Sequence, residues 1–101
     1  MATDFDLTGK VAIVTGGNSG IGYGIAQGLA HAGADIVVAA RQPAKNAQAT
    51  ANLQALGVRA LSVSTDVRDE ASVQAMVEAS VETFGHVDIL LDSGEFCEQA
   101  N

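Results

Sequence analysis

The chain has 101 residues, of which 48% are hydrophobic, and its 12 Asp and Glu against five Lys and Arg give a net charge of −7. This length suits one small domain with a modest core. So few basic residues, spread along the chain, argue against a nucleic-acid surface, and no apolar run is long enough to span a membrane. Cys97 is the single cysteine, which excludes an internal disulfide and a cysteine-based metal cluster. Because the N-terminus has no hydrophobic signal segment, we expect a cytoplasmic protein.

The first predicted element is a strand over residues 10–15, which leads into the glycine-rich stretch 16–22. A helix is predicted from about residue 20 to residue 32, with Gly33 just past its end. Its expected apolar face repeats every four positions, at Ile21, Ile25 and Leu29. A strand, a glycine turn and a helix N-terminus together favour phosphate binding, because the first amides of a helix lack partners. The alternative is a glycine-rich turn that binds no ligand.

The remaining sequence repeats the alternation of strand and helix. Further elements are predicted as strands over residues 35–40, 59–64 and 87–91 and as a helix over about 43–56. A third helix begins after Asp66 or Asp69, either of which can cap it, and ends at Gly85. Its expected apolar face consists of Val73, Met76, Val77, Val81 and Phe84. This β-α-β-α-β-α-β order predicts an α/β fold with a doubly wound parallel sheet in the strand order 3-2-1-4.

The carboxyl ends of these strands are the expected place for a binding site. In a doubly wound sheet, ligands bind at that edge, next to the point where the strand order reverses. The glycine turn, Arg41 and the segment 65–67 all follow strands and therefore lie on this edge. Asp35 begins its strand instead, which places it about 15 Å away at roughly 3.3 Å per residue. We therefore expect a site formed by three loops and exclude Asp35 from it.

The motif Thr15-Gly16-x-x-x-Gly20-x-Gly22 resembles the cofactor turn of the short-chain dehydrogenase/reductase family, and the similarity extends from about residue 7 to residue 91. The spacing differs from the G-x-G-x-x-G turn of other dinucleotide-binding enzymes, and no Gly-Lys-Ser/Thr completes a P-loop. The resemblance implies a Rossmann-type fold, incomplete here, with a dinucleotide-binding domain over residues 1–91 and a divergent polar tail over residues 92–101. The cofactor-binding residues that it implies within the turn are Thr15, Gly16, Asn18, Ser19, Gly20, Ile21 and Gly22.

The end of the second predicted strand indicates which nicotinamide dinucleotide the site prefers. Ala40 stands where an acid usually binds the ribose hydroxyls of NAD(H), and Arg41 follows it. A guanidinium pairs with a phosphate through two hydrogen bonds, and this pattern in the family implies a preference for NADP(H), with NAD(H) as the alternative. Asp66 and Val67 resemble the family's Asp-Val pair, which contacts the adenine. Asp66 as a simple helix cap and Arg41 as a solvated surface residue are the alternatives.

The catalytic residues of the family have no counterpart in this sequence. Hydride transfer in the family uses a Tyr, a Lys four residues later, a Ser and an Asn, but the only tyrosine here is Tyr23 and no Tyr-x-x-x-Lys occurs. Where the family pattern continues with Asn-Asn-Ala-Gly, the chain reads Asp92-Ser93-Gly94. We therefore assign no catalytic and no metal-binding residue, and we expect that a truncation or a reading-frame change replaced the second half.

Two functions follow from this sequence. The first is the NADP(H)-preferring dinucleotide-binding portion of a short-chain dehydrogenase/reductase that acts on an alcohol/carbonyl pair. The alternative is a non-catalytic module, derived from that family by truncation, which binds a dinucleotide or a partner protein. Without further strands and helices, the fourth predicted strand would expose Leu90 and Leu91. We therefore also expect self-association through that edge of the sheet.

Overall fold

Seven elements alternate along the chain in the computed structural model, which describes residues 6–18 and 20–92. The strands are β1 (Val11–Thr15), β2 (Asp35–Ala40), β3 (Ala60–Ser64) and β4 (Ile89–Asp92). The helices are α1 (Gly20–His31), α2 (Pro43–Gln54) and α3 (Glu70–Phe84). The predicted order of elements is confirmed. The largest differences in bounds are that α2 ends at Gln54 and that β4 is shifted toward the C-terminus, so that Asp92 closes the strand; the other ends differ by at most one residue.

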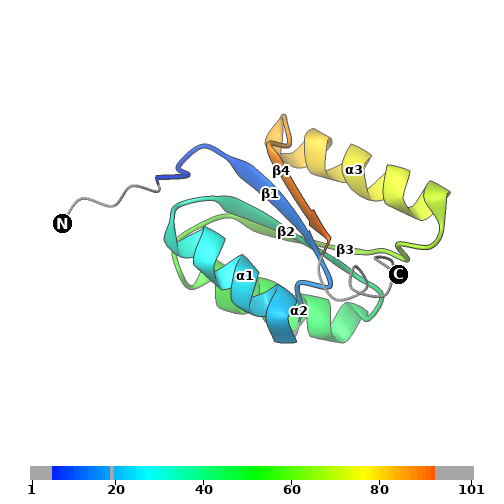
Figure 1. Ribbon diagram of the computed structural model, residues 1–101, viewed down its shortest axis with the longest axis horizontal. Helices are drawn as coiled ribbons and strands as arrows, with labels where there is room; N and C mark the ends of the chain where they lie inside the picture. The colour runs from blue at the N-terminus through cyan, green and yellow to red at the C-terminus, as the bar shows by residue number, and fades with distance from the viewer. Residues whose placement is uncertain (1–5, 19, 93–101) are drawn as a thin grey trace, which may run out of the picture.

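The four strands form one parallel sheet in the order β3-β2-β1-β4, which confirms the predicted doubly wound topology. Helices α1 and α2 cover one face of the sheet and α3 covers the other (Figure 1). All four strands point the same way, so the glycine turn after β1 and the loops after β2 and β3 leave the sheet at a common edge. We call this edge the carboxyl rim and the opposite edge the amino rim.

Alternate residues of the central strands divide the core into two clusters. Ala12 and Val14 of β1 pack with residues of β2, α1 and α2, whereas Val11 and Ile13 pack with Met76 of α3. The central strands β1 and β2 are apolar at nearly every position because both faces of the sheet are covered there. The longest described helix, α3, has 15 residues, and none within the described ranges is both long and apolar enough to cross a bilayer.

The buried face of α1 differs from the predicted one at Ile21. Its buried residues are Gly22, Ala26 and Ala30, whereas Ile21 is 78% exposed. Small residues allow the helix axis to approach the sheet closely, so they occupy the contact line and displace the larger side chains to its margins. The prediction that Ile21 faces the core is therefore wrong.

The apolar face predicted for α3 is confirmed at Met76 and Phe84 but wrong at Val81, which is 43% exposed. Ser80 is fully buried in this part of the helix instead. Its hydroxyl donates to the carbonyl oxygen of Met76 at 2.8 Å, which satisfies the polar group within the helix.

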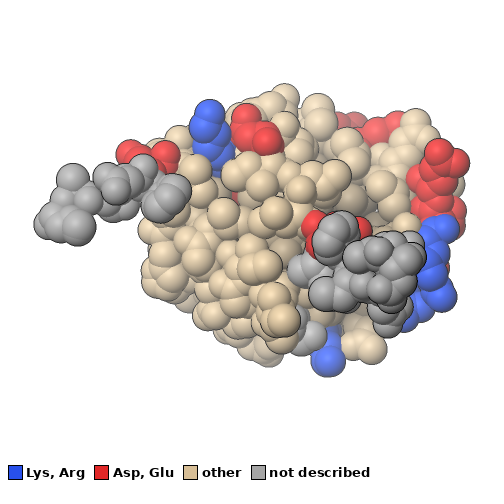
Figure 2. Space-filling model, viewed as in Figure 1, with Lys and Arg blue, Asp and Glu red and all other residues tan. Residues whose placement is uncertain are grey.

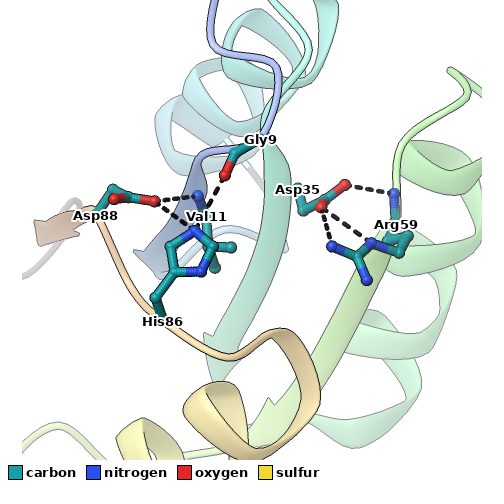
Figure 3. Close-up of polar contacts among 6 residues, drawn as sticks. All are labelled: Gly9, Val11, Asp35, Arg59, His86 and Asp88. Atoms are coloured by element: carbon teal, nitrogen blue, oxygen red, sulfur yellow. Dashed lines mark hydrogen bonds and ion pairs between the residues drawn. The ribbon is translucent and has the colours of Figure 1, made fainter.

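Two polar clusters tie the outer strands to the inner ones at the amino rim (Figure 3). Asp35 accepts hydrogen bonds from the backbone N–H, Nε and Nη2 of Arg59 at 2.8–3.0 Å. Asp88 Oδ2 accepts from the backbone N–H of Val11 at 2.9 Å, and His86 Nε2 lies 3.0 Å from that same oxygen. The predicted exclusion of Asp35 from the carboxyl rim is thus confirmed, and its carboxylate serves to join β2 to β3.

Candidate functional site

The turn after β1 requires glycine for conformational and steric reasons. Gly16 has φ +70° and Gly20 has φ +60°, both in the left-handed region that favours glycine. Gly17 has an ordinary φ but lies against β1, where an added Cβ would stand 3.0 Å from the carbonyl oxygen of Val14. The sequence motif indicated Gly16 and Gly20 but missed Gly17, because the constraint there is a contact with the preceding strand.

The backbone N–H groups of this turn differ in whether the fold supplies an acceptor for them. The N–H of Gly16 donates to the carbonyl oxygen of Ala39 at 2.8 Å, so Gly16 shapes the turn and its amide is already engaged. Helix α1 begins at Gly20, so the amides of its first turn have no acceptor within the helix. Gly22 is buried beneath this turn and Ile21 is exposed beside it. Ser19 lies outside the described residues.

The surface near this helix terminus is electrostatically suited to an anion. The first turn of α1 contains no acidic residue, and the helix sequence carries no Lys, Arg, Asp or Glu. Figure 2 shows a correspondingly broad uncharged surface over α1. The partial positive charge at the N-terminus of the helix is therefore not neutralised by a carboxylate of its own first turn.

Thr15 is oriented toward the neighbouring strand. The residue is 6% exposed, and its hydroxyl donates to Asp92 Oδ1 at 2.8 Å, with the carbonyl oxygen of Leu91 at 3.3 Å. This contact joins the carboxyl ends of β1 and β4. Thr15 therefore lies at the predicted place but contacts β4 through its side chain.

A chain of hydrogen bonds connects the three loops of the carboxyl rim. Asn18 donates through Nδ2 to Asn46 Oδ1 at 3.0 Å, and Asn46 donates through its own Nδ2 to the carbonyl oxygen of Ala40 at 2.9 Å. The same carbonyl oxygen accepts from the N–H of Thr65 at 2.9 Å. Asn46 is 1% exposed and is thus a buried polar link between the glycine turn and the end of β2.

Sequence reasoning missed Asn46, although α2 contains a signal for it. The buried residues of this helix are Asn46, Ala49 and Leu53, which are spaced as one helical face. A single amide on an otherwise apolar face must be hydrogen-bonded once it is buried. Its position in the first half of α2, close to the rim loops, could have indicated that Asn46 bonds to the site.

A cleft of about 110 Å³ opens on the carboxyl rim between the glycine turn and the loops after β2 and β3. It is lined by Gly16, Ala40, Arg41, Thr65, Asp66, Val67 and Arg68. Four of the residues predicted from the sequence therefore lie around one cavity, namely Gly16, Arg41, Asp66 and Val67. Arg68 is the charged lining residue that sequence reasoning did not single out.

Asp66 is held in this cleft by Arg68 and by α3. Its Oδ1 accepts from the backbone N–H of Arg68 at 3.0 Å and from Arg68 Nε at 3.2 Å, while its own N–H donates to Ser72 Oγ at 2.9 Å. The hydrogen bonds from the side chain and then the backbone of Arg68 lower the pKa of Asp66, and the charge of Arg41 acts in the same direction. Asp66 is therefore ionised at neutral pH.

Of the two residues predicted as possible caps of α3, Asp69 is the one that caps the helix. Asp69 precedes the helix with extended backbone, and its Oδ1 accepts from the N–H of Ala71 at 3.0 Å. The described side-chain contacts of Asp66 are to Arg68 instead, which leaves its carboxylate at the cleft, while its backbone carbonyl oxygen accepts from the N–H of Asp69 at 3.0 Å. Within residues 6–18 and 20–92, no three His, Cys, Asp or Glu side chains lie close enough together to hold a metal ion.

The fold and the rim define a Rossmann-type α/β protein, with a parallel sheet ordered 3-2-1-4 and a cleft beside the first glycine turn. The family model described as short chain dehydrogenase matches residues 10–94. The chain therefore belongs to the short-chain dehydrogenase family of oxidoreductases, which confirms the resemblance indicated by the glycine turn.

Several proteins of known name or structure are similar to this chain. The short chain dehydrogenase/reductase astE of Aspergillus oryzae is 48% identical over 90 residues, which cover 88% of this chain and 34% of that protein. The 2-dehydro-3-deoxy-D-gluconate 5-dehydrogenase of Escherichia coli is 42% identical over 90 residues, with the same two coverages of 88% and 34%. L-sorbose reductase from Gluconobacter frateurii, solved with NADPH and L-sorbose, matches 87% of this chain and 34% of its own with a TM-score of 0.83 and 45% identity. The chain thus spans about a third of the length of these relatives.

Proposed function

We propose that this chain is the NADP(H)-preferring dinucleotide-binding portion of a short-chain dehydrogenase/reductase, with residues 1–91 as its binding domain. The observation that carries the proposal is the cleft that joins Gly16, Arg41, Asp66 and Val67 on the carboxyl rim. The diphosphate, the 2′-phosphate and the adenine of the cofactor then each have a counterpart on this rim. The whole protein would act on an alcohol/carbonyl pair, as an oxidoreductase of this family.

The preference for NADP(H) rests on the charges at the end of β2. Ala40 offers no carboxylate to the ribose hydroxyls, and Arg41 lines the cleft immediately after it. A guanidinium attracts a 2′-phosphate and can bind it through two parallel hydrogen bonds. The NADPH in the solved L-sorbose reductase complex supports the same cofactor for this chain.

The remaining contacts follow from the geometry of the rim. The amides at the start of α1 and the positive end of its dipole suit the diphosphate, with Gly20, Ile21 and Gly22 in the first turn. The ionised carboxylate of Asp66 is suited to accept a hydrogen bond from the adenine amino group. Because the sequence contains no Tyr-x-x-x-Lys, we assign cofactor binding and no hydride-transfer step to these residues.

The proposal is tested by calorimetric titration with adenosine 2′,5′-bisphosphate and adenosine 5′-monophosphate, which differ only in the 2′-phosphate. The wild-type chain is expected to prefer the bisphosphate, and Arg41→Ala is expected to weaken its binding by about 1.5–3 kcal/mol, or roughly tenfold to a hundredfold. Binding of the monophosphate should change little. NADPH and NADH provide the same comparison for the complete dinucleotides.

Lys10→Ala is the matched control, because it removes the same charge from an exposed residue that precedes β1 at the amino rim. It should leave the preference for the bisphosphate intact. If both variants lost the preference for the bisphosphate equally, Arg41 would act only through the net charge of the chain. Equal binding of the two ligands by the wild type would contradict the NADP(H) preference and favour NAD(H).

Self-association through β4 is a second candidate function of this chain. In the described sheet β4 pairs with β1 and stands last in the strand order, and Leu90 on it is 59% exposed. An edge strand with an exposed apolar side chain favours pairing with a second copy.

Sedimentation velocity tests this second candidate. The wild-type chain is expected to form a dimer whose population rises with concentration, and Leu90→Lys is expected to shift it to monomer, since the added charges repel across a two-fold axis. Leu56→Lys, at a residue 38% exposed between α2 and β3, is the control and should leave the dimer unchanged. A wild-type chain that sediments as a monomer at all concentrations would exclude this candidate.

A further inference from the structure

Arg68 is a second guanidinium on the cleft, and it is bonded to the one carboxylate there. It lines the same cavity as Arg41 and Asp66. Its Nε lies 3.2 Å from Asp66 Oδ1, and its Nη2 lies 3.5 Å from Asp66 Oδ2. Arg68 thus faces the cleft while it is engaged with Asp66, whereas Arg41 has no described bond to that carboxylate.

The contacts of Asp66 differ between its two carboxylate oxygens. Oδ1 accepts from the backbone N–H and the Nε of Arg68 at 3.0 and 3.2 Å, while the described contact of Oδ2 is the long one from Nη2 at 3.5 Å. A carboxylate oxygen has two lone pairs, so Oδ2 retains more capacity to accept. The backbone of Asp66 is anchored from the other side by Ser72 Oγ at 2.9 Å. Arg68 and Ser72 together therefore restrict both the side chain and the backbone of Asp66.

Resting on the proposed function, we propose that Arg68 is a positioning residue for the base of the bound nucleotide. It holds Asp66 through Oδ1, so that Oδ2 accepts the hydrogen bond of an exocyclic amino group. A 6-aminopurine supplies that donor, whereas the carbonyl oxygen of a 6-oxopurine would face the carboxylate as a second acceptor and be repelled. The ion pair of Asp66 and Arg68 thus selects adenine over hypoxanthine, while Arg41 selects the 2′-phosphate.

The alternative role of Arg68, as a direct phosphate ligand, predicts a different pattern of losses. A phosphate ligand affects the preference for the 2′-phosphate and is indifferent to the base. A residue that acts through Asp66 affects the preference for the base and is indifferent to the 2′-phosphate. The two preferences are measured separately with inosine 2′,5′-bisphosphate and adenosine 5′-monophosphate, each compared with adenosine 2′,5′-bisphosphate.

The experiment measures dissociation constants of these three nucleotides for the full chain and for Arg68→Gln, Arg68→Lys and Arg41→Ala. We expect the wild type to bind the adenine bisphosphate about tenfold or more tightly than the hypoxanthine one, as one hydrogen bond to a charged group allows. Arg68→Gln should reduce this ratio several-fold and leave the 2′-phosphate ratio unchanged. Arg68→Lys, which keeps the charge but has a single ammonium group, should restore the ratio only in part. Arg41→Ala should show the reverse pattern.

A readout without ligand separates positioning from general stability. Because Arg68 lowers the pKa of Asp66, the carboxyl resonance of Asp66 in Arg68→Gln should titrate at a higher pH than in the wild type. The same shift should be smaller in Arg41→Ala, since Arg41 has the weaker influence. An unchanged thermal midpoint would show that neither variant is unfolded.

The outcomes distinguish this inference from the proposed function. An unchanged base ratio in Arg68→Gln, with normal loss of 2′-phosphate selectivity in Arg41→Ala, overturns the role of Arg68 alone. A fall of the 2′-phosphate ratio in Arg68→Gln makes Arg68 a phosphate ligand and also overturns it. A wild type that binds neither bisphosphate overturns the proposed function, and the role of Arg68 with it.

Discussion

Asn46→Leu is expected to lower the free energy of unfolding by about 2–3 kcal/mol, because it removes a buried amide that bonds on both sides. Asn46 is 1% exposed, accepts from Asn18 at 3.0 Å and donates to Ala40 at 2.9 Å. Leucine has a similar volume, so the loss reports the hydrogen bonds and not a cavity. The carbonyl oxygen of Ala40 keeps its bond from Thr65, whereas Asn18 loses its described acceptor. Urea unfolding followed by circular dichroism measures the change.

The matched control is Asn52→Leu on the same helix. Asn52 is exposed, and its described contact is a hydrogen bond of 3.4 Å from Gln48. An exposed substitution of this kind should change the free energy of unfolding by less than about 0.5 kcal/mol. Asn46→Leu should also weaken binding of adenosine 2′,5′-bisphosphate, since the glycine turn loses its link to the end of β2. Equal stability of the two variants would show that the buried network contributes nothing.

The order of elements and the strand topology could be predicted from the sequence because both depend on local patterns. The rotation of a helix about its axis depends on contacts, and here prediction was less reliable. On α1 the large residues Ile21 and Ile25 give the strongest hydropathy signal, yet Gly22 and Ala26 make the closest approach to the sheet. On α3 the position of Val81 was assigned to the core, but Ser80 is buried there with its hydroxyl bonded to its own helix.

Site residues could be predicted where the neighbouring sequence alone indicates the role of a residue. A glycine that ends a strand, a basic residue after a strand and an Asp-Val pair are such signals, and Gly16, Arg41, Asp66 and Val67 lie on one cleft. The roles of Gly17, Asn46 and Arg68 come from atoms brought close by folding. Asp66 and Asp69 were equal candidates for the cap of α3, and side-chain geometry alone distinguishes them.

Gly17→Ala is expected to destabilise the chain by about 1–3 kcal/mol, as overpacking against a fixed neighbour does. The new Cβ would lie 3.0 Å from the carbonyl oxygen and 3.2 Å from the Cβ of Val14, and both are tighter than ordinary contacts. Val14 is fully buried and its strand is paired on both sides, to β2 and to β4, so it cannot yield. The turn must move instead, and binding of adenosine 2′,5′-bisphosphate should weaken with it. Thermal unfolding and calorimetry measure the two effects.

Gly24→Ala is the matched control, because the same Gly-to-Ala substitution is expected there to raise the free energy of unfolding instead of lowering it. Gly24 lies within α1, has no positive φ, and an added Cβ there meets no atom within 4 Å. Alanine in an exposed helix interior should therefore stabilise the chain by about 0.5–1 kcal/mol. If Gly17→Ala stabilised the chain as Gly24→Ala does, the turn would have room for a side chain. In that case, the contact between Gly17 and β1 does not determine the position of the glycine turn on the carboxyl rim.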